Sequence, residues 1–277
     1  MGTTALEHWR QSLDAWRIPA AVLDRAPESP WVLPRAVFVR RADAQLAEPI
    51  GATYQRAMAA LPVPGTVLDV GAAAGATSLP LAAAGRVTHL TAVDGDSSLL
   101  DSLAERALRI GVPLDRVIGL WPDSAVHTPV VHVVVCGNVL YNVADLAPFV
   151  AALTDHARGT VVVETAVRHP LTELNPLWRH FHSIARPTGP TVDDLLAALD
   201  ELGVHPEVTR WRRPPEAEHA HFAELVDVTR RRLCLPPSAA PEVDRALRDL
   251  GHSPDFPPDL GSSGRELATL TWPGVAV

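Results

Sequence analysis

Apolar residues change their spacing along the 277-residue chain near residue 66. Before that point they recur every three or four positions in residues 3–18, and a second helical pattern runs through residues 54–61, which predicts two helices. A proline-punctuated segment lies between them. We therefore expect a helical N-terminal region that covers residues 1–62.

From residue 66 onward, short valine-rich runs alternate with helical patterns. The first five runs are TVLDV, HLTAVD, RVIGLWPD, HVVVCGN and GTVVVET. Strands that are almost continuously apolar and separated by helices predict a parallel sheet covered on both faces. Two later runs, PEVTRW and ELATLTW, predict two more strands. Helices are expected at residues 191–203, opened by a capping box at Thr191 and Asp194, and at residues 216–233.

Composition limits the classes of protein that fit. The formal net charge of −8 gives no basic field for a nucleic-acid backbone. No apolar run approaches the ~20 residues that span a bilayer, and the N-terminus lacks a secretory pattern. The two cysteines, Cys136 and Cys234, lie in apolar surroundings without CxxC spacing, which favours reduced packing residues. We therefore expect a cytoplasmic protein.

The stretch VLDVGAAAGATSLPLA, residues 67–82, places a glycine-bearing turn between a strand and a helix. A dinucleotide-binding turn would need glycines at 73 and 76, where this chain has Ala73 and Ala76. A phosphate-binding Walker loop is also missing. What remains is Asp69-x-Gly71-x-x-x-Gly75, which suits an uncharged or zwitterionic group with Asp69 placed to receive a cation. The same glycines would also fit a plain packing turn.

Acidic residues follow the next two strands. Asp94 ends the second strand, where a carboxylate typically accepts hydrogen bonds from a ribose diol. The third run ends in Trp121-Pro122-Asp123, an apolar face beside an acceptor suited to an exocyclic amine. An aspartate at a strand end can equally cap the following helix. Three acids at three successive strand ends, with the glycine turn first, favour a ligand.

With these motifs the chain resembles the class I S-adenosylmethionine-dependent methyltransferases, from about Pro64 to Trp272. The resemblance implies an α/β fold: a doubly wound, mostly parallel, seven-stranded Rossmann-like sheet with a helical N-terminal lid. It implies that the glycine turn holds the methionine part of S-adenosyl-L-methionine, Asp94 the ribose and Asp123 the adenine amine. One departure is Ala73, which replaces the middle glycine of the family's usual GxGxG, a replacement that many members accept. The residues placed at the cofactor are Asp69, Gly71, Ala72, Ala73, Gly75, Asp94, Gly95, Trp121, Pro122, Asp123, Asn138 and Tyr141.

Two further stretches, APESPW and NPLWRHFHSIARPTGPTVDDL, resemble a group of bacterial, actinobacterial small-molecule methyltransferases. This implies a small-molecule acceptor, methylated on O, N or C, in specialised metabolism. It also implies a lid of residues 1–62 and a catalytic domain of residues 63–277, with a substrate-loop insertion around residues 168–190.

Methyl transfer needs an aligned acceptor and, where required, a base. The candidate bases are His182, His180 and Glu164; the two histidines share a face only if their segment is extended. No metal site is expected, because the fourth strand ends in Cys136, Gly137 and Asn138. Each of these histidines would otherwise be an ordinary solvated residue. The candidate acceptor-binding residues are Tyr54, Trp178, Phe181 and Arg186, with Phe38 and Arg41 as further lid residues.

Three alternatives remain at this level. An RNA methyltransferase would share the core but would usually carry a basic groove. A dehydrogenase would need the missing pyrophosphate glycines. A non-catalytic S-adenosylmethionine-binding protein would share every cofactor motif. We expect a small-molecule substrate and no nucleic-acid or membrane partner, and a homodimer stays open.

Overall fold

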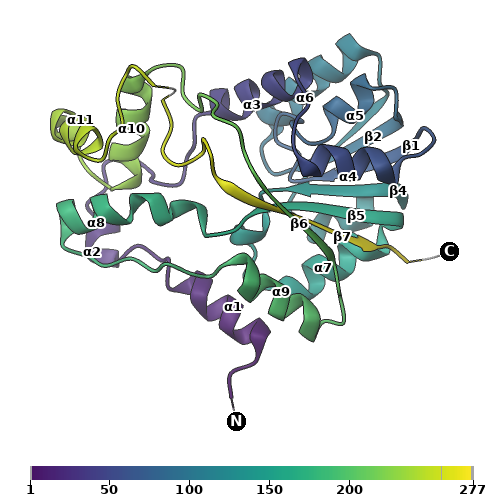
Figure 1. Ribbon diagram of the computed structural model, residues 1–277, viewed down its shortest axis with the longest axis horizontal. Coiled ribbons are helices and arrows are strands. Elements are labelled where there is room, and N and C mark those ends of the chain that lie inside the picture. The colour runs from purple at the N-terminus through teal and green to yellow at the C-terminus, as the bar shows by residue number, and fades with distance from the viewer. Residues whose placement is uncertain (1, 257, 276–277) are drawn as a thin grey trace.

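A computed structural model describes residues 2–256 and 258–275, built around a seven-stranded sheet (Figure 1). The strand order is β3-β2-β1-β4-β5-β7-β6, and only β7 runs antiparallel to its neighbours. This confirms the predicted fold class. The strands are β1 (Gly65–Val70), β2 (Val87–Asp94), β3 (Leu114–Ile118), β4 (Val131–Gly137), β5 (Ala157–Ala166), β6 (Glu207–Arg212) and β7 (Glu266–Pro273).

Helices cover both faces of the sheet. In the view of Figure 1, α4, α5 and α6 lie above it and α1, α7 and α9 lie below it. The helices are α1 (Ala5–Asp14), α2 (Ala20–Leu23), α3 (Arg35–Ala47), α4 (Ala52–Ala60), α5 (Leu79–Ala83), α6 (Ser97–Ile110), α7 (Leu146–Asp155), α8 (Asn175–His182), α9 (Val192–Glu201), α10 (Phe222–Arg232) and α11 (Ala240–Asp249). Short 3₁₀ turns are η1 (Asp123–His127), η2 (Leu140–Asn142), η3 (Pro170–Leu174) and η4 (Pro237–Ala239). Among the described residues, no helix is long and apolar enough to cross a membrane.

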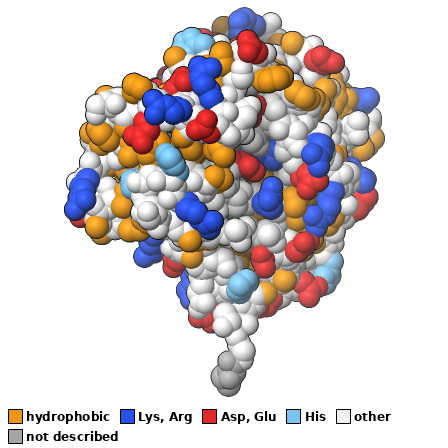
Figure 2. Space-filling view, turned by 60° about the vertical axis from the view of Figure 1, so that its left-hand side comes forward, with side chains coloured by type: hydrophobic (Ala, Val, Ile, Leu, Met, Phe, Trp, Pro, Cys, Tyr) orange, Lys and Arg blue, Asp and Glu red, His pale blue; other side chains and the backbone are white. Residues whose placement is uncertain are grey.

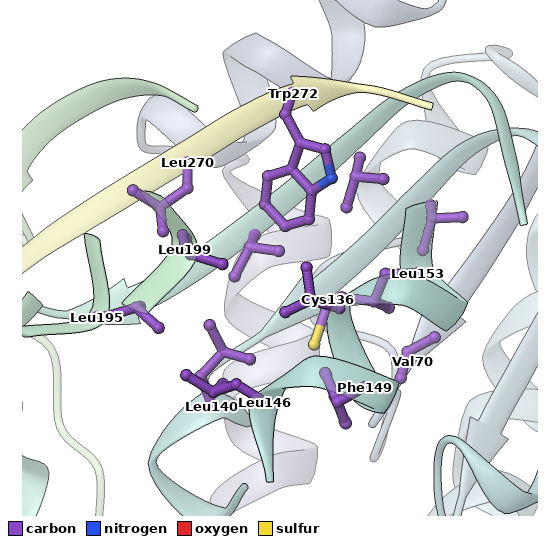
Figure 3. Close-up of a cluster of buried hydrophobic side chains, with 14 of the residues drawn as sticks. Val70, Cys136, Leu140, Leu146, Phe149, Leu153, Leu195, Leu199, Leu270 and Trp272 are labelled. Carbon is purple, nitrogen blue, oxygen red and sulfur yellow. The ribbon is translucent and has the colours of Figure 1, made fainter. Parts of the chain in front are cut away.

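The largest apolar cluster lies between the sheet and the lower helices (Figure 3). There the side chains of α7 and α9 meet those of β4, β5 and β7, with Cys136, Phe149 and Trp272 near the middle. Trp9 of α1 is fully buried in this cluster, and its indole N–H donates to the Val143 carbonyl at 2.9 Å. Burial of a whole tryptophan stabilises the folded state by several kcal/mol, so Trp9 holds α1 against the sheet.

Another apolar cluster joins the helices α2, α8, α10 and α11. We call this part of the protein the helical lobe. Helix α8 lies in the segment that follows β5, and α10 and α11 lie in the segment that leads into β7. Because β7 is antiparallel, both segments belong to the edge where the parallel strands end. The lobe therefore faces the carboxyl ends of the strands, as Figure 1 shows on its left side.

Three elements of the helical lobe differ from those predicted from the sequence. The stretch around residues 168–190, predicted as a loop insertion, contains η3 and α8. The helix predicted from residue 216 begins at Phe222, where His221 caps its first turn. The proline-rich region after it contains α11, whose apolar residues at helical spacing pack on α10.

Helix α3 lies over the glycine turn. Ala42 of α3 is fully buried against Ala74, and Phe38 packs on the same small cluster. Arg35, at the start of α3, is ion-paired with Asp96 at 2.8 Å. Of the N-terminal helices, α3 lies over the glycine turn, whereas α1 and α4 pack on opposite faces of the sheet; a lid role for residues 1–62 stays a prediction. The domain boundary at residue 62 stays a prediction.

Candidate cofactor and acceptor site

The turn after β1 takes up backbone conformations that favour glycine. Gly71 has φ +71° and Gly75 has φ +89°, and Ala73 between them also lies in the left-handed region at φ +45°. The N–H groups of Gly71 and Ala72 both donate to the carbonyl of Val93, at 2.9 and 3.0 Å. The turn is therefore hydrogen-bonded to the end of β2, and these bonds fix its backbone conformation without a ligand.

The glycines are also needed because protein atoms approach them closely. A Cβ atom at Gly71 would lie 2.4 Å from Val139 Cγ2, and one at Gly75 would lie 2.6 Å from Leu79 Cδ1. Val139 directly follows Asn138, so the turn and the exit of β4 are in contact. The sequence left open a ligand role and a packing role for Gly71, and the structure shows that packing against Val139 requires glycine here.

Asp94 holds this turn through both carboxylate oxygens. Oδ2 accepts from the Ala73 N–H and Oδ1 from the Asp96 N–H, each at 2.8 Å. The residue is only partly buried, and each carboxylate oxygen can accept a second hydrogen bond. Asp94 can therefore receive two hydroxyl groups of a diol without releasing the turn.

Asp69 is a buried acid without partners. Its side chain is 1 % exposed, and neither carboxylate oxygen has a hydrogen-bond partner among the described residues. Burial raises the pKa of Asp69 to about 7; the hydroxyl and backbone N–H of Ser78, which lie near the carboxylate outside hydrogen-bond geometry, oppose this rise, and the nearby Asp94 adds to it. An unpartnered buried acid is costly, and it is the kind of group that a ligand cation would stabilise.

The residues after β3 form an exposed rim. Asp123 is exposed and makes no hydrogen bond within the described chain, so its carboxylate is open to a ligand. The indole of Trp121 instead turns to α7, where its N–H donates to the Phe149 carbonyl at 3.3 Å. Leu120, which the sequence reading missed, is 71 % exposed and adjoins Gly95. Its apolar surface lies between the ends of β2 and β3.

At the ends of β4 and β5, Asn138 and Glu164 are joined. The Asn138 amide donates to Glu164 Oε1 at 2.7 Å, and the buried Arg213 donates to the same oxygen at 3.2 Å. Arg213 also donates to Ser262 at 3.2 Å. Burial lowers the pKa of Arg213 to about 10. This arrangement holds Glu164 at the strand edge, beside the chain segment that contacts the glycine turn.

Two other predicted site residues, Tyr141 and Tyr54, pack within or against the apolar core. Tyr141 is buried; its hydroxyl donates to the Ala166 carbonyl at 2.9 Å, and its ring packs on Trp9. Tyr54 of α4 is partly buried against the apolar cluster above the sheet. Burial raises the pKa of Tyr141, which keeps its hydroxyl neutral. A role for either tyrosine at a ligand stays a prediction.

The predicted catalytic histidines lie in the helical lobe, away from the glycine turn in Figure 1. Because their segment is the helix α8, the two rings diverge. His182 Nε2 lies 2.7 Å from the Leu233 carbonyl, and its ring packs on Trp178. His180 is exposed, 4.0 Å from Glu242 and edge-on to Phe181. Of the three candidate bases, the structure brings only Glu164 to the strand edge.

Sequence reasoning missed three residues of this region: Leu120, Arg213 and Arg232. None carries a local signal. Both arginines lie in late segments, and only the folded chain brings Arg213 to Glu164 of β5 and Arg232 to the wall of one small cavity with Leu174 and Trp178.

Scans of protein-family models and of curated proteins give no match to this chain. Solved structures do match. The S-adenosylmethionine-dependent methyltransferase from Geobacter sulfurreducens, in complex with S-adenosyl-L-homocysteine, is 20 % identical with a TM-score of 0.52, over 87 % of this chain and 98 % of its own. The corresponding Thiobacillus denitrificans protein, also with S-adenosyl-L-homocysteine, is 18 % identical with a TM-score of 0.51, over 86 % and 98 %.

A putative methyltransferase from Bacillus halodurans gives a TM-score of 0.52 at 15 % identity, over 80 % of this chain and 99 % of its own. Identities this low establish the fold. The chain has the class I S-adenosylmethionine-dependent methyltransferase fold, as the resemblance implied.

Proposed function

We propose that this protein binds S-adenosyl-L-methionine and transfers its methyl group to a small-molecule acceptor in specialised metabolism. The observation that carries the proposal is the pair of acids around the glycine turn. Asp94 is fixed by two backbone N–H groups and keeps acceptor capacity, and Asp69 is buried without a partner. Such a pair suits a ligand that has both a diol and an ammonium group.

The donor set fits this cofactor part by part. The ribose hydroxyls would donate to Asp94, and the ammonium group would compensate the charge of Asp69. Asp123 would accept from the adenine amine, with Leu120 as an apolar contact for the ring. Helix α3 would close over the bound cofactor, because Phe38 and Ala42 already pack on the turn.

The acceptor would lie at the ends of β4 and β5. Bound S-adenosylmethionine would supply an electrophilic methyl group; the chain must hold the acceptor atom in line with it and keep water out. Glu164 stands at this edge, held by Asn138 and Arg213, and can orient an acceptor hydroxyl or amine. This favours Glu164 as the residue that contacts the reacting end of the acceptor.

The surface supports a small acceptor rather than a nucleic acid. On the face shown in Figure 2, acidic and basic side chains are interspersed, and no continuous basic stripe follows that face. A phosphate backbone would need such a stripe.

Calorimetric titration with S-adenosyl-L-homocysteine tests the proposal. The Asp94→Asn variant removes the carboxylate charge from the diol site, with an expected cost of about 1–3 kcal/mol in binding, or roughly 5- to 150-fold. Asp115→Asn is the matched control, because Asp115 is an exposed acid on the neighbouring strand β3. Thermal unfolding of both variants separates loss of binding from loss of fold.

Two results would contradict the proposal. One is equal affinity of the wild type and Asp94→Asn for S-adenosyl-L-homocysteine. The other is an absence of binding by the folded wild-type protein. Turnover of radiolabelled S-adenosylmethionine with extracts that contain candidate acceptors then distinguishes an enzyme from a non-catalytic binding protein.

A further inference from the structure

Asp69 lies near the end of β1, two residues before Gly71 of the glycine turn, with a strand on each side. It pairs in register with Ala92 of β2 and Val135 of β4. Its side chain is almost fully buried, and neither carboxylate oxygen has a hydrogen-bond partner among the described residues. An acid in such surroundings carries either a proton or a charge that no protein group compensates.

The titratable groups that face Asp69 are acidic or neutral. Asp94 of β2 is the charged group that acts on it, and Asp94 accepts hydrogen bonds only from backbone N–H groups. Cys136 of β4 is a neutral thiol, because burial raises its pKa and the charge of Asp69 adds to that rise. Within the described chain, no basic side chain is ion-paired with either acid; Arg35, at the start of α3, pairs with Asp96 instead.

A proton is therefore the cation that reaches Asp69 in the free protein. Burial raises the pKa of Asp69 to about 7, so about half of the molecules carry this proton at neutral pH. A ligand that brings its own cation competes with the proton, because the ionised carboxylate attracts the cation and the neutral acid does not. A cation close to a carboxyl group lowers its pKa by about 1–3 units.

We propose that binding of S-adenosyl-L-methionine or S-adenosyl-L-homocysteine releases a proton from Asp69, whose place as the compensating cation is taken by the ammonium group of the ligand. The O–H bond of the carboxyl group breaks, the proton goes to the solvent, and the ligand ammonium keeps its protons. The inference rests on the proposed function, because it takes this cofactor as the ligand. It adds that Asp69 makes recognition of the amino-acid end of the ligand dependent on pH.

The sign of this dependence follows from the form of Asp69 that binds. Because the ionised form attracts the ammonium group, affinity rises as the pH rises through about 7. If the ligand lowers the pKa of Asp69 by about 2 units, affinity at pH 6 is about 10-fold weaker than at pH 8, and binding at pH 7 releases about half a proton. A ligand without the ammonium group leaves the proton on Asp69.

Calorimetry in two buffers measures the released proton. Binding of S-adenosyl-L-homocysteine at pH 7 is measured in phosphate and in Tris, which take up a proton with different heats. The difference between the two binding enthalpies, divided by the difference between the two buffer heats, gives the number of protons released. 5′-Methylthioadenosine is the matched ligand, because it has the same nucleoside and no ammonium group.

We expect about half a proton per bound S-adenosyl-L-homocysteine and none for 5′-methylthioadenosine. Equal release for the two ligands, or binding of S-adenosyl-L-homocysteine without release, overturns the proposal. This comparison uses the wild-type protein alone, so it decides the matter even if a variant does not fold.

Asp69→Asn assigns the proton to this residue. The variant keeps the shape of the side chain and cannot titrate, so S-adenosyl-L-homocysteine should bind it without proton release and with the same affinity at pH 6 and pH 8. Asp155→Asn, at an exposed acid of α7, is the control and should release as many protons as the wild type. Undiminished release by folded Asp69→Asn contradicts the assignment.

The same titrations separate this inference from the proposed function. If S-adenosyl-L-homocysteine binds the wild type without proton release, the proton inference fails alone. If it does not bind the folded wild type at all, the proposed function fails and the proton inference fails with it.

Discussion

Asp69→Asn is expected to change how the stability of the protein depends on pH. In the folded chain, burial raises the pKa of Asp69 from 3.8 to about 7. A folded-state pKa above the unfolded value means that the folded protein binds the proton more tightly. The stabilising contribution is therefore complete below about pH 4 and is lost as the pH rises through about 7.

The size of this effect follows from the shift. About 3 pKa units correspond to about 4 kcal/mol of unfolding free energy, lost between about pH 4 and pH 7. Two other groups face Asp69. Asp94 adds to the rise of its pKa, and Cys136 stays a neutral thiol in this range because burial raises its pKa. The asparagine variant keeps the shape of the side chain and removes the titration.

Denaturant unfolding at a series of pH values measures the effect. The wild type should lose stability relative to Asp69→Asn from about pH 4 to pH 7, and the difference between them should then stay constant. Asp155→Asn, at an exposed acid of α7, should follow the wild type. Parallel curves for the wild type and Asp69→Asn would refute the reasoning, because the pKa of Asp69 would then be the same in the folded and unfolded states.

Three further predictions concern the turn, the strand edge and the lobe. Gly71→Ala should cost about 1–3 kcal/mol more stability than Gly85→Ala in thermal unfolding. Both glycines have positive φ, but only a Cβ at Gly71 would meet a neighbour, Val139; equal costs would count against this contact. Arg213→Met should cost about 3 kcal/mol in denaturant unfolding, because a buried ion pair loses one member; no loss would mean that the pair is not formed. His182→Ala should cost about 1 kcal/mol of stability in thermal unfolding and leave methyl transfer nearly intact, because its imidazole lies at the Leu233 carbonyl in the helical lobe; a 10²-fold loss of turnover with the fold intact would instead make His182 the base.

The sheet and the cofactor edge could be predicted because their signals are local. Buried parallel strands appear as continuous apolar runs, and the carboxyl ends of such strands lie along one edge. Asp69, Gly71 and Asp94 were therefore placed near one another from sequence, and the contact of Asp94 with the turn agrees with that placement.

The acceptor side could not be predicted in the same way. Residues 168–190 contain prolines at both ends, and these prolines favoured a loop over the short helix α8 that lies between them. The orientation of Trp121 depends on its contact with α7, which no local pattern shows. Arg213 and Arg232 have ordinary surface-like sequences around them, and only the tertiary packing of late segments buries them.

A small cavity in the helical lobe limits how the interior of the lobe could change. Its walls come from three separate parts of the chain: residues 16–31, residues 171–186 and Arg232. Exchange of any one contiguous segment with a relative would replace one wall and leave the others unmatched. A repacked cavity would therefore have to arise from point changes spread over the gene rather than from recombination at a single boundary.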